Sequence, residues 1–589
     1  MEGSNGPIED TACLKICRKV VHPLSGLVTA ACLLEFIGWS GAITDWQHWC
    51  TTLTGIGFGL ERGWVFRKLN PRGMERKRLE MHVAFGIFVF LVSLVLLVLP
   101  RPASGDWPPG GHVFVQISVL VSALASVVFH QTRYTARAFH PGMVLIGSFF
   151  LIIVAGCLLL KMPLCVVPGA TCSWLDAIFT STSAVCVTGL AVQNTATFFS
   201  PTGQTVILLL IQIGGLGIMT LTFFAAVVLF EGLSLHDRLL LGKMIQENRL
   251  ARVGETLAFI VILTFVCESV GAVVLFLGMD GATDFGTRVF DAVFHSVSAF
   301  CNAGFSIFPD GLASGAVNGN WIWQVCIMAL IIIGGLGSLV DEDLTLWATA
   351  KVKRKIMGHD IPRRRLRVHT RLVLTITLAL VVGGAAVIMA TEYLLWNGPK
   401  NGGTVLTAFF HSVTARTAGF NTVPMQQIGP LTIQALMILM IIGGSPGGTA
   451  GGLRTTVAAI GLAQLWNQLR MGPGGIVAFN RTIPRETGTQ ALGLIVLVGL
   501  WLVANFVIFQ ILETGSGVSE TKLLFELISA FATVGLSLDL TPMLTDGGKI
   551  LMVVNMFVGR IGLLTVCATL LPRNSRPAPG KPAENILLT

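Results

Sequence analysis

The sequence predicts an all-α polytopic membrane protein with four helix–pore-helix–filter–helix repeats around a central pore. The first observation is composition: the 589 residues are 53% hydrophobic and only 12% charged, with a mean hydropathy of +0.75. Soluble domains carry about a quarter charged residues, so this chain cannot solvate its own surface. The second observation is that apolar runs long enough to cross about 30 Å of hydrocarbon recur along the chain. The third is a glycine-bearing segment that occurs four times.

The repeated segments are short, and each contains a central glycine. The glycines are 115, 115 and 116 residues apart, a period far longer than that of any solenoid. Each segment follows a Ser/Thr/Ala-rich amphipathic run and precedes a long apolar run, so we expect four copies of one membrane unit around one axis. The segments are Val187-Thr188-Gly189-Leu190, Asn302-Ala303-Gly304-Phe305, Thr417-Ala418-Gly419-Phe420 and Thr533-Val534-Gly535-Leu536.

An N-terminal extension, residues 1–140, precedes the first repeat and is predicted to contain about four transmembrane helices. The second of its apolar runs is the least hydrophobic, but Trp46, Trp49 and Trp64 near its ends suit a membrane interface. No signal peptide is recognisable in the first twenty residues. The four expected helices are 24–43, 46–66, 82–99 and 112–129.

Each repeat is predicted to have an opening helix, a pore helix and a closing helix. A basic cytoplasmic loop, residues 341–368, separates the second and third repeats, and the tail 572–589 is expected to be disordered. The repeats span 141–230, 255–340, 369–460 and 489–571. Their predicted helices are 141–160, 173–185 and 204–230; 255–278, 287–300 and 321–340; 369–396, 403–415 and 431–460; 489–512, 520–532 and 547–570.

The distribution of Lys and Arg predicts the orientation. With the N-terminus inside, cytoplasmic segments hold 31 of the 40 basic residues and the outer loops hold six. We therefore expect a multi-pass protein of the plasma (inner) membrane with both termini in the cytoplasm. The net charge of +9 then lies against the lipids of the inner leaflet, which argues against nucleic-acid binding. The run Arg363-Arg364-Arg365 has two readings: lipid contact and topology, or docking of a cytosolic subunit.

Two cysteines, Cys165 and Cys172, share a loop that we expect outside the membrane. They could form a disulfide, although free thiols are favoured. Most other cysteines lie in apolar segments, where a thiol behaves as a small hydrophobe.

The four glycine segments have the properties of an ion selectivity filter. Backbone carbonyls can replace the hydration shell of a monovalent cation without a fixed charge that would trap it. Aiming several carbonyls inward requires backbone angles that glycine tolerates best. Irregular backbone at membrane depth is tolerated only where it lines a cavity or is buried in protein, and four segments in register meet this condition.

A glycine-rich run interrupts the third closing helix. Proline removes a helix hydrogen bond and glycine costs about 1 kcal/mol against alanine, so the helix must break here. The break is expected inside the membrane next to the filter; a kink for close helix packing is one explanation of it. The run also fits G-x-S-x-G, but a serine nucleophile requires a strand–turn–helix elbow with His and acid partners. It consists of Gly443, Gly444, Ser445, Pro446, Gly447, Gly448, Thr449, Ala450, Gly451 and Gly452.

Arg560 lies inside the fourth closing helix. An arginine at membrane depth is costly, so we expect it to face the cavity or a partner, although bonds to helix carbonyls are an alternative. On the pore reading, Arg560→Ala raises ion flux.

Arg416 directly precedes the third filter strand, where a cation would oppose a cation pore. We expect it to point away from the pore and to pair with a pore-helix carboxylate. The candidates are Glu526, Asp176 and Asp291, with Glu526 first. The outer acids Asp310, Asp539 and Asp546 either concentrate cations or are ordinary solvated charges.

These motifs together resemble the Trk/Ktr/HKT superfamily of potassium transporters, and most of all its bacterial Ktr/Trk pore subunits. The matching runs are TSAVCVTGL (182–190), HSVSAFCNAGF (295–305), HSVTARTAGFN (411–421), FELISAFATVGLS (525–537), IGGLG (213–217 and 333–337) and GGSPGGTAGG (443–452). The resemblance covers about 141–570. The four N-terminal helices depart from it, because Trk members carry two extra helices there.

The resemblance implies a potassium path, since glycine at the first filter position, here Gly189, accompanies potassium selectivity in the family. It implies K⁺ at the carbonyls of Thr188, Asn302, Thr417 and Thr533. It also implies an intramembrane gating loop at 443–452, with Arg560 as an electrostatic barrier and Glu526 as a residue of the fourth pore helix.

The family further implies a homodimer on a cytosolic RCK-type nucleotide-binding ring, so that nucleotide acts only through that regulatory subunit. We expect no cofactor in this chain and no enzymatic activity. A sodium-permeable or weakly selective transporter is the main alternative, and an intramembrane serine hydrolase is a remote one. Channel-like and Na⁺- or H⁺-coupled transport stay open.

Overall fold

The computed structural model describes residues 52–53, 55–57, 141–217, 253–279, 284–314, 317, 319–357, 365–392, 405–470, 476–515, 517–563 and 566–567. The predicted helices 24–43, 82–99 and 112–129 and the tail 572–589 lie outside these residues, as does most of 46–66.

The described residues are mostly helical, and each repeat has an opening, a pore and a closing helix where the sequence predicts them. The repeats contain, in order, α6 (Pro141–Leu160), α7 (Trp174–Val185) and α9 (Pro201–Leu216); α12 (Val253–Leu277), α13 (Phe285–Phe300) and α14 (Trp321–Leu336); α16 (Val368–Ala390), α17 (Val405–Thr414) and α18 (Pro430–Ile441); α20 (Arg485–Leu512), α21 (Glu520–Phe531) and α22 (Asp546–Ile561).

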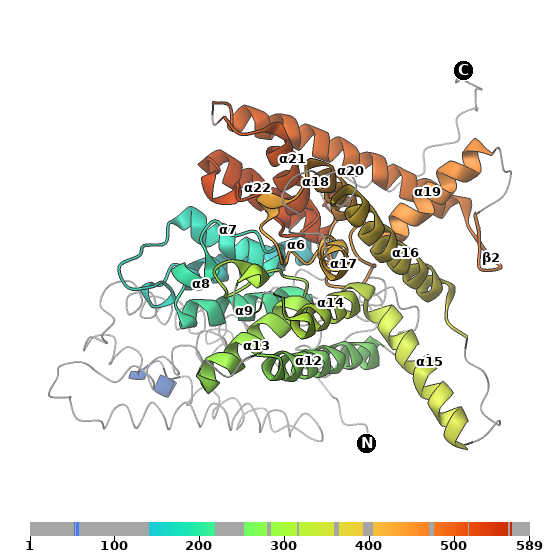
Figure 1. Ribbon diagram of the computed structural model, residues 1–589, viewed down its shortest axis with the longest axis horizontal. Coiled ribbons are helices and arrows are strands. Elements are labelled where there is room, and N and C mark those ends of the chain that lie inside the picture. Colours follow the sequence, from blue (N-terminus) through green and yellow to red (C-terminus); the bar gives the residue numbers. More distant parts are fainter. Residues whose placement is uncertain are drawn as a thin grey trace, which may run out of the picture.

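Shorter elements connect these helices. A two-stranded antiparallel hairpin, β1–β2, pairs Val477 with Thr482 and extends with α15 and α19 from one end of the bundle (Figure 1). The connecting elements are η3 (Pro163–Cys165), α8 (Thr195–Phe198), η5 (Gly311–Ala313), α15 (Ser338–Met357), η7 (Met425–Gln427), α19 (Thr455–Leu469), β1 (Ile476–Ala478), β2 (Arg481–Ile483) and η8 (Thr541–Met543).

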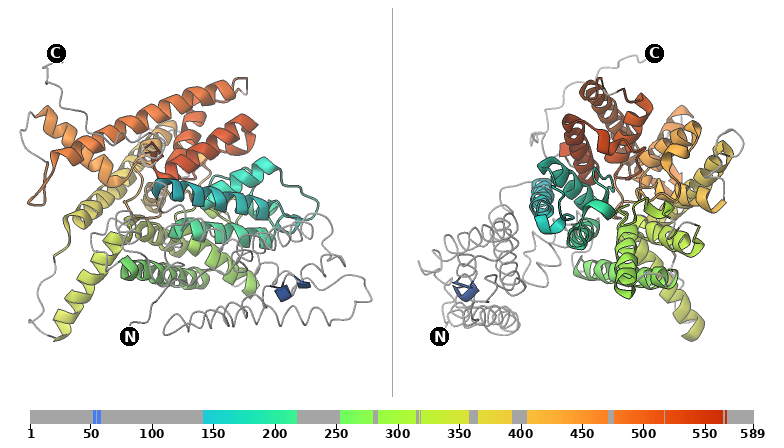
Figure 2. Two further views of the ribbon diagram at one scale, coloured as in Figure 1. Left: turned by 180° about the vertical axis from the view of Figure 1, so that it is seen from behind. Right: turned by 60° about the vertical axis from the view of Figure 1, so that its left-hand side comes forward.

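The four repeats form a closed ring. The closing helix of each repeat packs against the pore helix of the next: α9 on α13, α14 on α17, α18 on α21 and α22 on α7. Figure 2 shows the repeats grouped around a common centre, from teal through green and orange to red. The pore helices are largely buried in this centre, so the ring encloses the filter strands that follow them.

One contact fixes the pore helix to the opening helix in the first three repeats. A serine on the pore helix donates to an opening-helix carbonyl: Ser181 to Ile153, Ser296 to Glu268 and Ser412 to Val381, at 2.7, 2.7 and 2.9 Å. The residue three positions further on is glycine each time, and a Cβ there would lie 2.4 Å from the serine Oγ. Ile153, Glu268 and Val381 therefore occupy equivalent positions.

The closing helices are shorter than predicted. Only the third was expected to break, but α9, α14 and α22 also end in glycines with positive φ: Gly217 (73°), Gly337 (90°) and Gly562 (92°). This corrects the predicted uninterrupted helices 321–340 and 547–570; of 204–230, residues 218–230 lie outside the described part. Glycine at this position adopts the left-handed conformation that ends a helix. After Gly337 the chain turns by 104° into α15.

Three described helices are long and apolar enough to cross a membrane: Ala258–Leu277, Val368–Ala390 and Arg485–Leu512. The bent pair Trp321–Leu336 and Ser338–Ile356 passes the same test as one span. Shorter apolar helices of the repeats are Ile146–Leu160, Pro201–Leu216, Val405–Thr414 and Pro430–Ile441.

Cys165 and Cys172 are free thiols, as favoured from the sequence. Burial raises the pKa of each to about 11, so both remain protonated near neutral pH.

Candidate ion filter and gate

The four filter glycines form a closed ring of close contacts. A Cβ built on Gly189 would lie 2.4 Å from the carbonyl oxygen of Ala303 in the next repeat. The same test on Gly304, Gly419 and Gly535 finds the oxygens of Ala418, Val534 and Thr188 at 2.5, 2.4 and 2.2 Å. Each glycine therefore abuts the carbonyl that precedes the glycine of the following repeat. The strands lie too close together for any side chain at these four positions.

The backbone of each strand requires glycine for a second reason. The four glycines have φ of +90°, +70°, +78° and +93°, and the residue two positions earlier is also left-handed, with φ between +50° and +74°. Non-glycine residues in this region are strained by about 1–3 kcal/mol. Alternation of left-handed and extended residues turns successive carbonyls to the same side of a strand, as a filter requires. The earlier left-handed residues are Val187, Asn302, Thr417 and Thr533.

This geometry corrects the predicted carbonyl ring. The prediction grouped Thr188 with Asn302, Thr417 and Thr533. The contacts place the carbonyl of Thr188 at one level with those of Ala303, Ala418 and Val534. Val187 is the residue at the level of Asn302, Thr417 and Thr533. The prediction was therefore off by one residue in the first repeat, whose alignment with the other three is given by the position of its glycine.

A hydroxyl near the end of each pore helix holds the filter strand. Ser183 accepts from the amide of Thr188 through its carbonyl and from Gly189 through its Oγ, at 2.8 and 3.1 Å. Ser529 binds Val534 and Gly535 in the same way. In the second and third repeats the hydroxyls of Ser298 and Thr414 donate instead to the carbonyls of Phe305 and Phe420, both at 2.8 Å.

The predicted break in the third closing helix is confirmed. Helix α18 ends at Ile441 and α19 begins at Thr455. The loop ends are pinned together, because Gly443 N donates to Leu453 O and Thr455 N donates to Gly444 O, at 2.9 and 3.0 Å. Residues 443–452, the gate loop, fill the space between.

The gate loop is seated on the broken closing helix of the second repeat. Ser445 N donates to Gly335 O at 3.0 Å, and the amide and hydroxyl of Thr449 both donate to Gly334 O, at 3.3 and 3.1 Å. In return, Ser338 N donates to Gly447 O at 3.2 Å. On its other side, Gly451 abuts Thr533, a residue of the fourth filter strand. The loop therefore lies directly against the filter.

The hydrolase alternative does not fit this geometry. Ser445 lies in a loop between two helices, and its hydroxyl is buried with no hydrogen-bond partner among the described residues. A nucleophile elbow requires a strand before the serine and a histidine within hydrogen-bond reach.

Two buried arginines donate to the carbonyls of the gate loop. Arg560 donates through Nη1 to Thr449 O and through Nη2 to Gly214 O, the latter at 2.6 Å, so it ties the loop to the first repeat. Arg560 therefore binds backbone carbonyls and lies against residues 443–452; its action as a barrier to ions stays a prediction.

Arg454 was missed from the sequence. Its Nη1 donates to Ala450 O at 2.5 Å and to Ser445 O at 3.2 Å, so it ties the two limbs of the loop to each other. The available signal was a cation immediately after a run of glycines, whose carbonyls lack helix partners.

The predicted pair of Arg416 with a carboxylate is wrong. The nearest partner of Arg416 is the hydroxyl of Thr377, at 3.5 Å, and its Nε is buried without a partner in the described part. Glu526 instead accepts from Ser537 Oγ, Leu538 N and Thr541 Oγ1, at 2.5, 3.2 and 3.0 Å. These neutral donors lie in the loop after the fourth filter strand, so Glu526 does support the filter, by another route.

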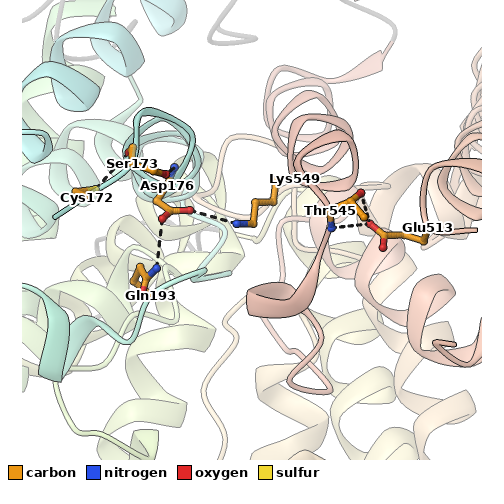
Figure 3. A network of polar contacts seen from close by, with 7 residues as sticks. All are labelled: Cys172, Ser173, Asp176, Gln193, Glu513, Thr545 and Lys549. Atoms are coloured by element: carbon orange, nitrogen blue, oxygen red, sulfur yellow. Dashed lines mark hydrogen bonds and ion pairs between the residues drawn. The ribbon is translucent and has the colours of Figure 1, made fainter. Parts of the chain in front are cut away.

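The other two candidates do not pair with Arg416 either; Asp176 is engaged elsewhere, and only the backbone of Asp291 has a recorded contact. Asp176 forms an ion pair with Lys549 of the fourth repeat at 3.4 Å and accepts from Gln193 (Figure 3). This pair joins the first and last repeats. The carbonyl of Asp291 lies 2.8 Å from Nδ1 of His295. Of the outer acids, Asp539 accepts from Gln426 at 2.7 Å.

Comparisons with known proteins agree with this arrangement. The family model TrkH, described as a cation transport protein, matches residues 110–575. The chain is 33% identical over 460 residues to the potassium/sodium uptake protein NtpJ of Enterococcus hirae, covering 76% of this chain and 97% of that protein. It is 35% identical over 462 residues to the Ktr system potassium uptake protein B of Vibrio alginolyticus, covering 78% and 96%.

A solved structure shares the fold. The crystal structure of the potassium transporter TrkH from Vibrio parahaemolyticus matches with a TM-score of 0.57 and 16% identity, over 94% of this chain and 98% of that one.

Proposed function

Because the chain belongs to the TrkH family of cation transport proteins, we propose that it is the ion-translocating membrane subunit of a potassium uptake system. The observation that carries the proposal is the closed ring of four glycines, each against the carbonyl of the next repeat. Dehydrated K⁺ passes this ring, coordinated by the carbonyls of Thr188, Ala303, Ala418 and Val534. The names of the two relatives above support potassium as the ion.

The gate loop controls the path. It lies against the fourth filter strand and is held by Arg560 and Arg454, so its release opens the pore. Two guanidinium groups beside the loop add an electrostatic barrier to cations.

A sodium-permeable transporter is the second candidate. The name of the Enterococcus hirae relative includes sodium. The four strands also differ in the side chains at the level of Val187, Asn302, Thr417 and Thr533, so the ring is not fourfold symmetric.

The proposal includes the assembly. The chain forms a homodimer in the inner membrane, with both termini in the cytoplasm, on a cytosolic ring of RCK-type subunits that bind the regulatory nucleotide. The name "Ktr system" of a relative supports a multi-component system. This chain binds no cofactor of its own.

The test is ⁸⁶Rb⁺ uptake into liposomes that contain the purified chain, with Na⁺ competition, for the wild type and Gly189→Ser. Uptake should be selective in the wild type and should lose discrimination in the variant, because the new Cβ meets Ala303 O. Gly169→Ser is the matched control: Gly169 has φ +91° against +90° at Gly189, but nothing lies within 4 Å of its Cβ position.

Unchanged discrimination in Gly189→Ser overturns the filter assignment. Where the wild type shows no uptake, deletion of 444–451 should reveal it, and a silent deletion variant contradicts the pore itself.

A further inference from the structure

Glu268 is a buried carboxyl group for which the described residues provide no cationic partner. Glu268 lies in the middle of α12, with 5% of its surface exposed. Its Oε2 accepts from Nε2 of Gln212 on α9 at 3.2 Å, and its Oε1 lies 3.7 Å from the sulfur of Cys301. No Lys, Arg or His of the described residues forms an ion pair with it.

The first and third repeats have no acid at the position equivalent to that of Glu268. The backbone carbonyl of Glu268 accepts from Ser296, and the equivalent carbonyls in the first and third repeats belong to Ile153 and Val381. An apolar side chain at this position is therefore compatible with the fold of a repeat. The carboxyl group of Glu268 adds something that the fold does not need.

Its charge must be neutralised by a bound ion. A carboxylate buried away from water and without a cation is strongly unfavourable, and such a group takes up a proton instead. A metal cation is disfavoured, because both groups directed at the carboxyl are hydrogen donors, an amide and a thiol, and neither offers an oxygen ligand. We propose that Glu268 is a proton-binding site that links pH to the second filter strand.

The link runs through Cys301. This thiol belongs to the residue that caps α13, and the next residue is Asn302 of the filter. Helix α9 contacts it closely, since a Cβ on Gly215 would lie 2.3 Å from the sulfur. In the structure Gln212 donates to one oxygen of Glu268 and the thiol of Cys301 donates to the other. A proton on Oε1 turns that acceptor into an O–H donor, so the S–H of Cys301 must turn away from it, and this reorients the thiol next to the filter.

Gln212 provides a second connection. It lies two residues before Gly214, whose carbonyl accepts from Arg560 of the gate. The protonation state of Glu268 thus acts on both the filter and the residue that holds the gate loop.

The other ionisable groups around Glu268 are few. Helix α14 contributes Cys326, which donates to Gly271 O, and α15, which packs against α12, carries Asp341. Arg560 of α22 donates to Gly214 O, next to Gly215, which contacts Cys301. None of these is bonded to the Glu268 carboxyl, so its proton is held by burial, Gln212 and Cys301.

A direct test is a pH titration of the purified full-length chain by infrared difference spectroscopy. The wild type should show a carboxylic acid band that Glu268→Gln lacks. The matched control is Glu392→Gln, because Glu392 is also a buried glutamate on an opening helix but accepts from the amide of Gly429, at 2.8 Å. The band must persist in that control. A band unaffected by Glu268→Gln overturns the proton site.

The functional test is the pH profile of ⁸⁶Rb⁺ flux in liposomes, and it rests on the proposed transport function. The wild-type flux should follow a one-proton titration, Glu268→Gln should be flat, and Glu392→Gln should follow the wild type. Glu268→Asp retains the carboxyl group and should shift the midpoint, which separates titration from a folding defect. A flat wild-type profile, or a normal profile in Glu268→Gln, overturns the link to the filter. Absence of flux at every pH contradicts the transport function instead, and the infrared titration still decides the proton site.

Discussion

The four repeats make the same contact at their filter glycines, but they do not all make the same contact at the breaks in their closing helices. In the filter, a Cβ built on any of the four glycines would lie 2.2–2.5 Å from a carbonyl oxygen of the next repeat. At the breaks only three repeats agree. Glycines Gly214, Gly334 and Gly559 lie against the last carbonyl of their own pore helix, at 2.1, 1.9 and 1.8 Å. In the third repeat, Gly443 lies instead against Gly451 O of the gate loop, at 2.2 Å.

The third repeat also differs in the connection that precedes its filter. Five residues separate the pore-helix hydroxyl from the filter glycine in the other repeats, as between Ser183 and Gly189, but only four separate Thr414 from Gly419. Arg416 lies in this shortened connection. The comparison teaches that the four repeats keep one backbone contact at the filter glycines, whereas the third repeat alone departs from the others at the breaks.

The largest effect, a loss of ion selectivity, should come from substitution of a filter glycine, in whichever repeat it is made. Alanine at Gly304, Gly419 or Gly535 places a Cβ 2.2–2.5 Å from a backbone oxygen and is strained by its positive φ. Each variant should lose about tenfold or more of its K⁺/Na⁺ discrimination, which corresponds to roughly 1.4 kcal/mol. The measurement is Na⁺ competition of ⁸⁶Rb⁺ uptake in liposomes.

Alanine at Gly319, which has φ +78° but open space around it, is the control and should behave as wild type. If the third repeat alone tolerates alanine, the filter is not the fourfold-equivalent region described above.

An intermediate effect, on ion flux, should come from Arg560, whose partner Thr449 lies in the loop that distinguishes the third repeat. Arg560→Gln removes charged donors to Thr449 O and Gly214 O. A hydrogen bond to a charged group contributes about 1.5–3 kcal/mol, so release of the loop should raise flux about tenfold or more. Selectivity should be unchanged, which stopped-flow flux and Na⁺ competition can establish together.

Arg288→Gln is the matched control, because Arg288 also donates to two carbonyls, those of Phe276 and Met279, but far from the gate along the chain. Lower flux in Arg560→Gln would show that this arginine does not hold the gate closed.

The features of the fold that the sequence could predict are those that depend on local patterns of residues. The repeats and pore helices were predictable because glycine spacing and apolar run length are local properties. The break at 443–452 was predictable because six glycines and a proline are incompatible with a helix. The predicted helices ran through Gly217, Gly337 and Gly562 because apolar residues between and beyond the glycines continue the hydrophobic run, even where the run IGGLG marks a glycine-rich turn.

The side-chain partners were less predictable, because they depend on which way a residue faces in three dimensions. Arg416 and Glu526 were paired from their charges and from the family resemblance, yet each binds neutral groups of its own surroundings. Asp176 pairs instead with Lys549, which lies far away along the chain but in the repeat that is its neighbour in the ring. Arg454 has no signature beyond its place after the glycine run.

The smallest of the three effects should come from Arg454. Its bonds to Ser445 O and Ala450 O stay within the gate loop, so Arg454→Gln loosens the loop without detaching it from the first repeat. Flux should rise several-fold, less than in Arg560→Gln. Because Arg560 binds Thr449, the residue next to Ala450, the two changes should be non-additive by about 0.5–3 kcal/mol in a double-mutant cycle of fluxes. Strict additivity would mean that the two arginines act on separate elements, and the gate loop could not then be treated as one body that both of them hold.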